Sequence, residues 1–311
     1  MTDLTLEDIA KQAGVSRSTV SRVINDHPNV SEDVRTRVHK VIRKTGYRPN
    51  AAAQTLASKR SWMIGLVLPH SVSFFFTDPY YPHLIKGIAQ ACNQYNYTLA
   101  LFLVGSKEDE EKIFPRVARK GQLDGVIVQA GHHGDQEIIG HLVDYKMPAV
   151  VAGRPFNTRN VSYIDIDNID ASFKAVNYLI DNDYRRIATI MGPSNSTVGA
   201  DRKEGYLKAL TDKGRVPDDS LIVEGDFTEA GGYQAMQTLL PAKPDAVFAA
   251  SDMMAIGAMR AVREAGLKIP DDVAFVGFDD LPVATMSDVT LTTVRQPVVQ
   301  FGIKAVEMLI D

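Results

Sequence analysis

The chain has 311 residues, 45% of them hydrophobic and 23% charged, so it is long enough for two or three domains with ordinary cores. Its single cysteine excludes an internal disulfide framework, and with no secretory signal and no apolar run near the ~18 residues of a membrane span we expect a cytoplasmic protein without membrane contact. Residues 1–60 hold 11 Lys and Arg against 6 Asp and Glu while the whole chain has a net charge of −4, which is typical of a polyanion-binding head on an acidic body.

Residues 5–25 predict two short helices joined by a tight turn. Thr5 can cap the first helix with Asp8 as its partner, Gly14 can end it in a left-handed conformation, and Ser16 can cap the second helix. A third helix is expected from residue 31 to residue 46. The pattern indicates a helix-turn-helix, whose second helix enters the DNA major groove; a purely structural three-helix bundle is the alternative.

Residues 48–60 form a linker rich in alanine. Asn50 can cap a short helix there, but the stretch is too short to be stable alone. We expect it to order only when a partner or DNA is bound. Leu56 has no evident core to join.

From residue 63 onward, short apolar strands alternate with amphipathic helices. This alternation occurs in two successive sets and predicts two doubly wound parallel-sheet subdomains with a cleft between them. Ligands of such sheets bind beyond the carboxyl ends of the strands. The expected strands are residues 63–68, 98–104, 124–129, 149–152, 187–191, 221–223, 246–250 and 273–276. The expected helices are residues 84–95, 107–119, 135–145, 169–181, 200–213, 229–239 and 253–265.

Several segments resemble one family of bacterial regulators. Leu-Glu-Asp-Ile-Ala-Lys-Gln-Ala-Gly-Val-Ser-Arg from residue 6 and Gly-Tyr-Arg-Pro-Asn-Ala-Ala-Ala-Gln-Thr-Leu from residue 46 are similar to the head of the lactose-repressor/galactose-repressor family. Ala-Ser-Asp-Met-Met-Ala-Ile-Gly, Val-Gly-Phe-Asp-Asp-Leu-Pro and Leu-Thr-Thr-Val-Arg-Gln-Pro, which begin at residues 250, 276 and 291, resemble its effector domain.

The resemblance implies an α/β effector core, like a periplasmic binding protein, behind a small all-α head. It implies a helix-turn-helix domain over residues 1–47, a hinge over 48–60 and an effector-binding domain over 61–311. The first subdomain is expected at about 61–162 and 290–311, and the second at about 163–289. Family members usually continue with a further strand, so we expect the sequence to be truncated after residue 311.

The resemblance also assigns DNA contacts. The base-reading positions fall on Arg17, Ser18 and Arg22, and the fork of Arg17 suits guanine O6 and N7. In the hinge, Leu56 would enter a minor-groove step beside Ala53 and kink the duplex. Hydroxyl and amide groups expected on the phosphates, any of which could equally be a cap or a solvated group, belong to Thr5, Ser16, Thr19, Ser21, Asn25, Ser31 and Asn50.

The loops after the strands predict an effector site. Aromatic rings suit the apolar face of a sugar, and carboxylates and arginines suit its hydroxyls. A phenylalanine there could equally pack in the core, and Asp252 could equally cap the helix that it begins. The candidate effector residues are Phe76, Asp78, Tyr81, Gln129, Arg154, Arg202, Asp252, Asp279 and Gln296.

Catalysis is not supported by any motif. No phosphate-binding loop, dinucleotide fingerprint or nucleophile elbow is present, and the pair His132 and His133 lacks a ligand set for a metal. We therefore expect no catalytic residue, metal or cofactor.

The predicted function is a sequence-specific repressor. It would bind a pseudo-palindromic operator as a homodimer, or as a tetramer, until a small effector such as a sugar or oligosaccharide releases it. A corepressor that strengthens DNA binding is the nearest alternative. A sugar-modifying enzyme with a DNA-binding head is the alternative from another class.

Overall fold

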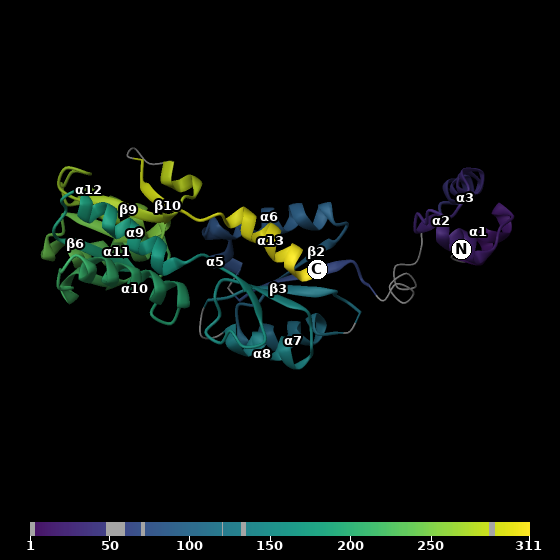
Figure 1. Ribbon diagram of the computed structural model, residues 1–311, viewed down its shortest axis with the longest axis horizontal. Helices are drawn as coiled ribbons and strands as arrows, with labels where there is room; N and C mark the ends of the chain where they lie inside the picture. Colours follow the sequence, from purple (N-terminus) through teal and green to yellow (C-terminus); the bar gives the residue numbers. More distant parts are fainter. Residues whose placement is uncertain (1–3, 48–59, 70–71, 120, 132–134, 286–289) are drawn as a thin grey trace. The chain divides into compact units, whose positions relative to one another are not determined.

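The structure is a computed structural model that describes residues 4–47, 60–69, 72–119, 121–131, 135–285 and 290–311. The chain divides into two compact units, residues 1–61 and 62–311 (Figure 1). Asn50, Ala53 and Leu56 lie outside the described residues, so the hinge assignments stay predictions. Among the described residues, no helix is long and apolar enough to cross a membrane.

The first unit is the expected helix-turn-helix. It comprises α1 (Leu6–Ala13), α2 (Arg17–Ile24) and α3 (Glu32–Thr45). The predicted capping pair forms, because the Thr5 N–H donates to Asp8 at 2.9 Å and the Asp8 N–H donates to Thr5 Oγ1 at 3.3 Å. Gly14 ends α1 with a left-handed φ of 65°, which a glycine adopts without steric cost. The core consists of Ile9, Ala10, Ala13, Val20, Val23, Val38 and Tyr47.

The second unit begins with a five-stranded parallel sheet in the order β2-β1-β3-β4-β5. Helices α6 (Tyr80–Gln94) and α13 (Val298–Ile310) cover one face, and α7 (Lys107–Val117) and α8 (Asp135–Asp144) cover the other (Figure 1). A short helix, α5 (Val72–Thr77), follows the first strand. The strands are β1 (Met63–Leu68), β2 (Thr98–Leu103), β3 (Gly125–Gln129), β4 (Ala149–Ala152) and β5 (Ser162–Ile164).

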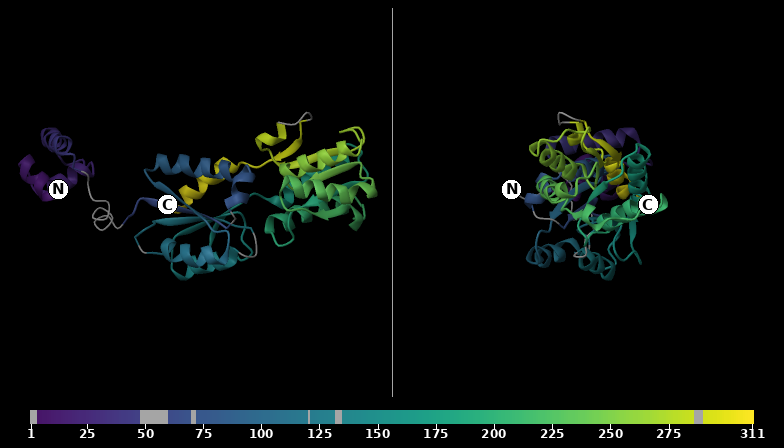
Figure 2. Two further views of the ribbon diagram at one scale, coloured as in Figure 1. Left: turned by 180° about the vertical axis from the view of Figure 1, so that it is seen from behind. Right: turned by 90° about the vertical axis from the view of Figure 1, so that its left-hand side faces the viewer.

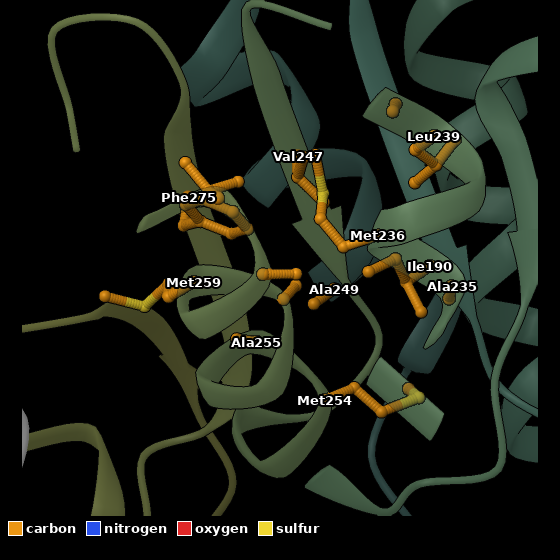
Figure 3. Packing of buried hydrophobic residues seen from close by; sticks show 14 of the residues in the cluster. Ile190, Ala235, Met236, Leu239, Val247, Ala249, Met254, Ala255, Met259 and Phe275 are labelled. Carbon is orange, nitrogen blue, oxygen red and sulfur yellow. The ribbon is translucent and has the colours of Figure 1, made fainter. Parts of the chain in front are cut away.

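The second sheet, also parallel, has the order β10-β9-β8-β6-β7. Helices α9 (Asn168–Asp181) and α10 (Thr197–Asp212) pack on one face, and α11 (Glu229–Leu239) and α12 (Asp252–Glu264) on the other. Figure 3 shows the core beneath α11 and α12, where Met236, Val247 and Phe275 pack together. The strands are β6 (Ile187–Met191), β7 (Ile222–Glu224), β8 (Ala246–Ala249), β9 (Ala274–Asp279) and β10 (Thr292–Arg295), and the 3₁₀ turns are η1 (Asp219–Leu221), η2 (Leu240–Ala242) and η3 (Pro282–Thr285).

The two sheets share one topology. In each, the first strand in the chain pairs with the second on one side and the third on the other, which places a topological switch point between β1 and β3 and another between β6 and β8. The chain leaves the first sheet after β5 and returns after β10 to form α13, which lies beside α6 (Figure 2). The subdomain limits predicted at residues 162 and 290 therefore move to the crossings after Ile164 and Arg295.

Two glycines allow α6 and α13 to pack closely. A Cβ at Gly87 would lie 2.0 Å from the Val299 carbonyl oxygen, and a Cβ at Gly302 would lie 2.4 Å from the Leu84 carbonyl oxygen. No side chain fits at either position without moving the facing backbone. The helix after the second crossing is therefore held firmly on the first sheet.

Three elements differ from the expected ones. The structure adds α5, β5 and β10, which the sequence pattern did not indicate. Both strands are edge strands with exposed or half-buried side chains, so they lack the continuous apolar run that marks a buried parallel strand. Strand β9 extends to Asp279, three residues further than expected, which makes Asp279 part of the sheet rather than of a loop.

Candidate DNA-binding surface and effector cavity

The outward face of α2 presents the three predicted base-reading residues. Arg17, Ser18 and Arg22 are all exposed. Arg17 Nε lies 3.2 Å from Glu7 on α1, and the Arg17 side chain stays 67% exposed. An exposed pair of this kind contributes little to stability, so it orients Arg17 without preventing a contact to a base.

The predicted phosphate-binding hydroxyls at the start of α2 are bonded to one another. Ser16 Oγ lies 2.8 Å from both Ser18 Oγ and Thr19 Oγ1, and it accepts the Thr19 N–H at 3.1 Å. Ser16 is therefore the N-cap of α2, as predicted. The Asn25 amide lies 3.5 Å from Ser21 Oγ.

Ser31 and Thr5 occupy the starts of the other two helices. Ser31 precedes α3 without a side-chain capping bond among the described residues, and its side chain is exposed. Thr5 shares its hydrogen bonds with Asp8. Contacts of these residues with DNA stay predictions.

A cavity of about 240 Å³ lies in the second unit at the carboxyl ends of the strands, where the topology predicts it. Nine of the ten strands are followed by a residue that lines it, from Asp78 after β1 to Gln296 after β10. Six predicted effector residues are among the lining residues: Asp78, Tyr81, Gln129, Arg202, Asp279 and Gln296. The sequence interpretation had not selected the others: Tyr80, Ala130, Gly131, Gly153, Asp165, Ser196, Val198, Asp226, Phe227, Ser251 and Met253.

Arg202 on α10 is the most extensively bonded side chain of the cavity, and only 4% of it is exposed. Its Nε donates to Asn168 Oδ1 at 2.9 Å, and its Nη2 donates to Gln296 Oε1 at 2.9 Å. Its Nη1 donates to the Ala250 carbonyl oxygen at 2.5 Å. Since Asn168 follows the first crossing and Gln296 lies in the second, one guanidinium joins both crossings.

Asp279 stands at the end of β9 next to this guanidinium. Its Oδ1 lies 3.5 Å from Arg202 Nη1, and its φ of 122° is one that side chains rarely adopt. Burial raises the pKa of Asp279 to about 8, although Arg202 acts in the opposite direction. Asp279 is thus held where its charged form is disfavoured, which is typical of a functional site.

Asp252 lies behind the cavity rather than in its lining. Its Oδ2 accepts the Leu281 N–H at 2.9 Å, and its Oδ1 accepts the Thr293 hydroxyl at 2.5 Å. Burial raises the pKa of Asp252 to about 6. The helix cap is Ser251, whose Oγ accepts the Met254 N–H at 3.2 Å, so Asp252 instead joins α12 to the chain after β9 and to β10.

The first subdomain contributes aromatic and acidic side chains. Asp78 Oδ1 accepts the Tyr80 N–H at 2.8 Å, and burial raises the pKa of Asp78. Tyr81 is 4% exposed, and its ring centroid is 5.5 Å from that of Tyr80 in an edge-to-face arrangement. These rings provide the apolar surface that a sugar face requires.

Phe76 and Arg154 do not line the cavity. The Phe76 side chain is 75% exposed, because α5 turns it away from the sheet. Arg154 instead forms a two-point pair with Asp201 on α10, with Nε–Oδ2 and Nη2–Oδ1 distances of 3.1 and 2.5 Å. Thr197 on the same helix donates from Oγ1 to the Arg154 carbonyl oxygen at 2.7 Å. Arg154 therefore joins the subdomains beside the cavity.

Phe227 and Asp226 show what the sequence interpretation missed. Both directly follow β7, in a stretch Glu-Gly-Asp-Phe that ends at residue 227. Their place after a strand was the available signal, but the loop after β7 was not among those selected. Phe227 packs against Gly192, where a Cβ would lie 2.3 Å from the ring.

No group of three metal-ligating side chains occurs among the described residues. The pair His132 and His133 lies outside them.

Comparison with known proteins identifies the family. Residues 5–50 match the family described as bacterial regulatory proteins of the lacI family, and residues 61–311 match periplasmic binding proteins and the sugar-binding domain of the LacI family. The chain belongs to the LacI family of DNA-binding transcriptional regulators. It is therefore a regulator rather than an enzyme, and it carries the family's sugar-binding domain, as the sequence motifs indicated.

Individual relatives are similar over nearly the whole chain. The HTH-type transcriptional regulator CelR of Thermobifida fusca is 38% identical over 99% of this chain and 91% of its own length, and catabolite control protein A of Priestia megaterium is 35% identical over 99% and 92%. A solved CelR–cellobiose complex is 37% identical with a TM-score of 0.77, covering 99% of this chain and 92% of that one. A lac repressor dimer bound to operator and an anti-inducer is 29% identical with a TM-score of 0.85 and the same coverage.

Proposed function

We propose that this protein is a homodimeric repressor that binds a pseudo-palindromic operator in the cytoplasm and releases it when a sugar or oligosaccharide occupies the cavity. The observation that carries the proposal is the cavity lining, because residues from both subdomains surround one space and Arg202 joins that space to both crossings. A ligand held by both subdomains stabilises one relative arrangement of them. The proposed sugar effector is supported by the CelR relative, which was solved with cellobiose.

The edge strand β2 supports the homodimer. Leu101 on this strand is 44% exposed, and β2 has a hydrogen-bonded neighbour on one side only within its sheet. An apolar side chain on an open edge is a surface that a second copy could cover. Sedimentation velocity on the full chain measures the oligomeric state directly.

The proposed contacts with DNA are those of the α2 face and the hinge. Arg17, Ser18 and Arg22 would read bases, and Leu56 with Ala53 would enter the minor groove. The exposed hydroxyl and amide groups of Thr5, Ser16, Thr19, Ser21, Asn25, Ser31 and Asn50 would contact phosphates.

Operator release by a sugar is the decisive measurement. A duplex selected from a randomised palindromic library serves as operator, and its fluorescence anisotropy with the full chain is followed while cellobiose, maltose, lactose or glucose is added. Loss of DNA binding on addition of one sugar supports the proposal. Tighter DNA binding would instead support a corepressor, and an unchanged affinity with every sugar would contradict a sugar effector.

Arg17→Ala tests the reading of bases. We expect a loss of about 1–3 kcal/mol on the selected operator and a much smaller loss on random DNA, because a bidentate contact to guanine discriminates between bases. Arg37→Ala is the matched control, since Arg37 is an exposed arginine of α3 that pairs with Asp33 at 3.3 Å. Equal losses on both duplexes would show that Arg17 contacts only phosphate.

A further inference from the structure

The only basic side chain among the described residues that line the cavity is Arg202, and all three of its nitrogen atoms already donate to the protein. The acceptors are Asn168, Ala250 and Gln296, and the guanidinium carbon lies 3.6 Å from the centroid of the Phe278 ring. Proteins recognise phosphate groups with available arginine or lysine donors. A phosphate in this cavity would have to compete for bonds that hold Arg202 in place.

Gln129 presents an acceptor without a partner. Its Oε1 is buried and accepts no hydrogen bond from the described residues, while its Nε2 lies 3.5 Å from the Ala130 carbonyl oxygen. The reverse orientation of the amide would place two acceptors together, so the oxygen faces the cavity. A buried acceptor without a donor is costly, and a ligand hydroxyl would supply that donor.

Carboxyl groups from both subdomains surround the same space. Asp78 and Asp165 come from the first subdomain, and Asp226 and Asp279 come from the second. They influence one another across the cavity, because the charge of Asp78 contributes to the raised pKa of Asp279. The lining therefore carries four acidic groups against one basic group, and an added anion would be repelled from both sides.

We propose that the cavity selects uncharged, hydroxyl-rich ligands and rejects their phosphorylated forms. This proposal rests on the proposed sugar effector and specifies its chemical class. Hydroxyl groups can donate to Gln129 and to the carboxylates at once, whereas a phosphate brings acceptors and negative charge to a site that already has both. Gln129, Asp78 and Asp226 are the residues that determine this selectivity.

Matched pairs of sugars test the proposal. Binding of cellobiose and cellobiose 6-phosphate, and of glucose and glucose 6-phosphate, is measured by isothermal titration calorimetry on the full chain. We expect the uncharged member of a binding pair to bind at least about tenfold more tightly. Equal or tighter binding of a phosphorylated member would overturn the proposal.

Three substitutions locate the selectivity. Asp78→Asn and Asp226→Asn should each narrow the ratio between the two members of a pair, while Asp212→Asn, on the exposed end of α10, should leave it unchanged. Gln129→Met, which keeps the length of the side chain without its acceptor, should weaken the uncharged sugar about tenfold. Ratios unaffected by both aspartate substitutions, or an unchanged affinity in Gln129→Met, would overturn the assignment.

Inorganic phosphate separates this proposal from the proposed function. At matched ionic strength, phosphate should raise the Tm of the full chain no more than chloride does. If phosphate stabilises the wild-type chain at least as much as a sugar does, the rejection of anions is wrong. If no sugar binds and phosphate also fails, the sugar effector is wrong while the rejection of anions is supported.

Discussion

The second subdomain contributes to the cavity polar groups that the protein itself already binds, whereas the first contributes groups that are largely free for a ligand. Arg202 and Asp252 have hydrogen-bond partners on several elements. Asp78 accepts a single printed bond, and Gln129 Oε1 accepts none from the described residues. The comparison indicates that one side holds the site in shape and the other identifies what enters.

The largest expected effect is that of Arg202→Ala. Removal of this side chain leaves buried acceptors on Asn168, Ala250 and Gln296 without donors, so we expect the free energy of unfolding to fall by about 3–5 kcal/mol. Urea denaturation followed by circular dichroism measures the loss. Arg260→Ala, a half-exposed arginine on α12 that pairs with Glu229 at 3.0 Å, should cost no more than about 1 kcal/mol. Similar losses in both variants would contradict a supporting role for Arg202.

Asp252→Ala should have the next largest effect. It leaves the Leu281 N–H and the Thr293 hydroxyl without their acceptor, at a cost of about 1–3 kcal/mol in unfolding free energy. Because Thr293→Val removes one of those donors, the double variant should be less destabilised than the sum of the two single variants. Strict additivity would show that the Thr293–Asp252 bond does not contribute to stability.

The pH dependence of stability tests Asp279. Its folded-state pKa is raised to about 8, so the folded chain holds a proton that the unfolded chain releases near pH 4. Stability should therefore fall as pH rises between these values, with a slope of up to ~1.4 kcal/mol per pH unit from this group, and level off above pH 8. Asp279→Asn, which cannot ionise, should lose this part of the slope. Parallel curves of Tm against pH for the two chains would contradict the buried, protonated state.

Asp78→Asn should have the smallest effect on stability. The amide oxygen of asparagine can still accept the Tyr80 N–H, so the unfolding free energy should change by no more than about 0.5 kcal/mol. Thermal denaturation without ligand measures it. A loss comparable to that of Asp252→Ala would show that both sides of the cavity support the fold and would remove the distinction between them.

The fold was largely predictable because its signals are local. Helix caps at Thr5 and Ser16 and the alternation of apolar strands with amphipathic helices need only short stretches of sequence. The residues of the cavity were harder to select, because a position after a strand does not say which way its side chain points. Phe76 and Phe227 both follow strands, yet only Phe227 lines the cavity. The pairing of Arg154 with Asp201 joins residues that are 47 positions apart, and no local pattern reports such a contact.

The close packing of Gly87 and Gly302 has a mechanical consequence. Since α13 is fixed to α6 and only Gln296 and Pro297 separate it from β10, torsion of the second sheet against the first must be absorbed in that dipeptide and in residues 165–167. Two short flexible points define one axis, as two pins define the swing of a gate. Ligands of different shape would then differ in the angle at which they stop the same rotation, and that angle is the quantity available for the DNA-binding head to read.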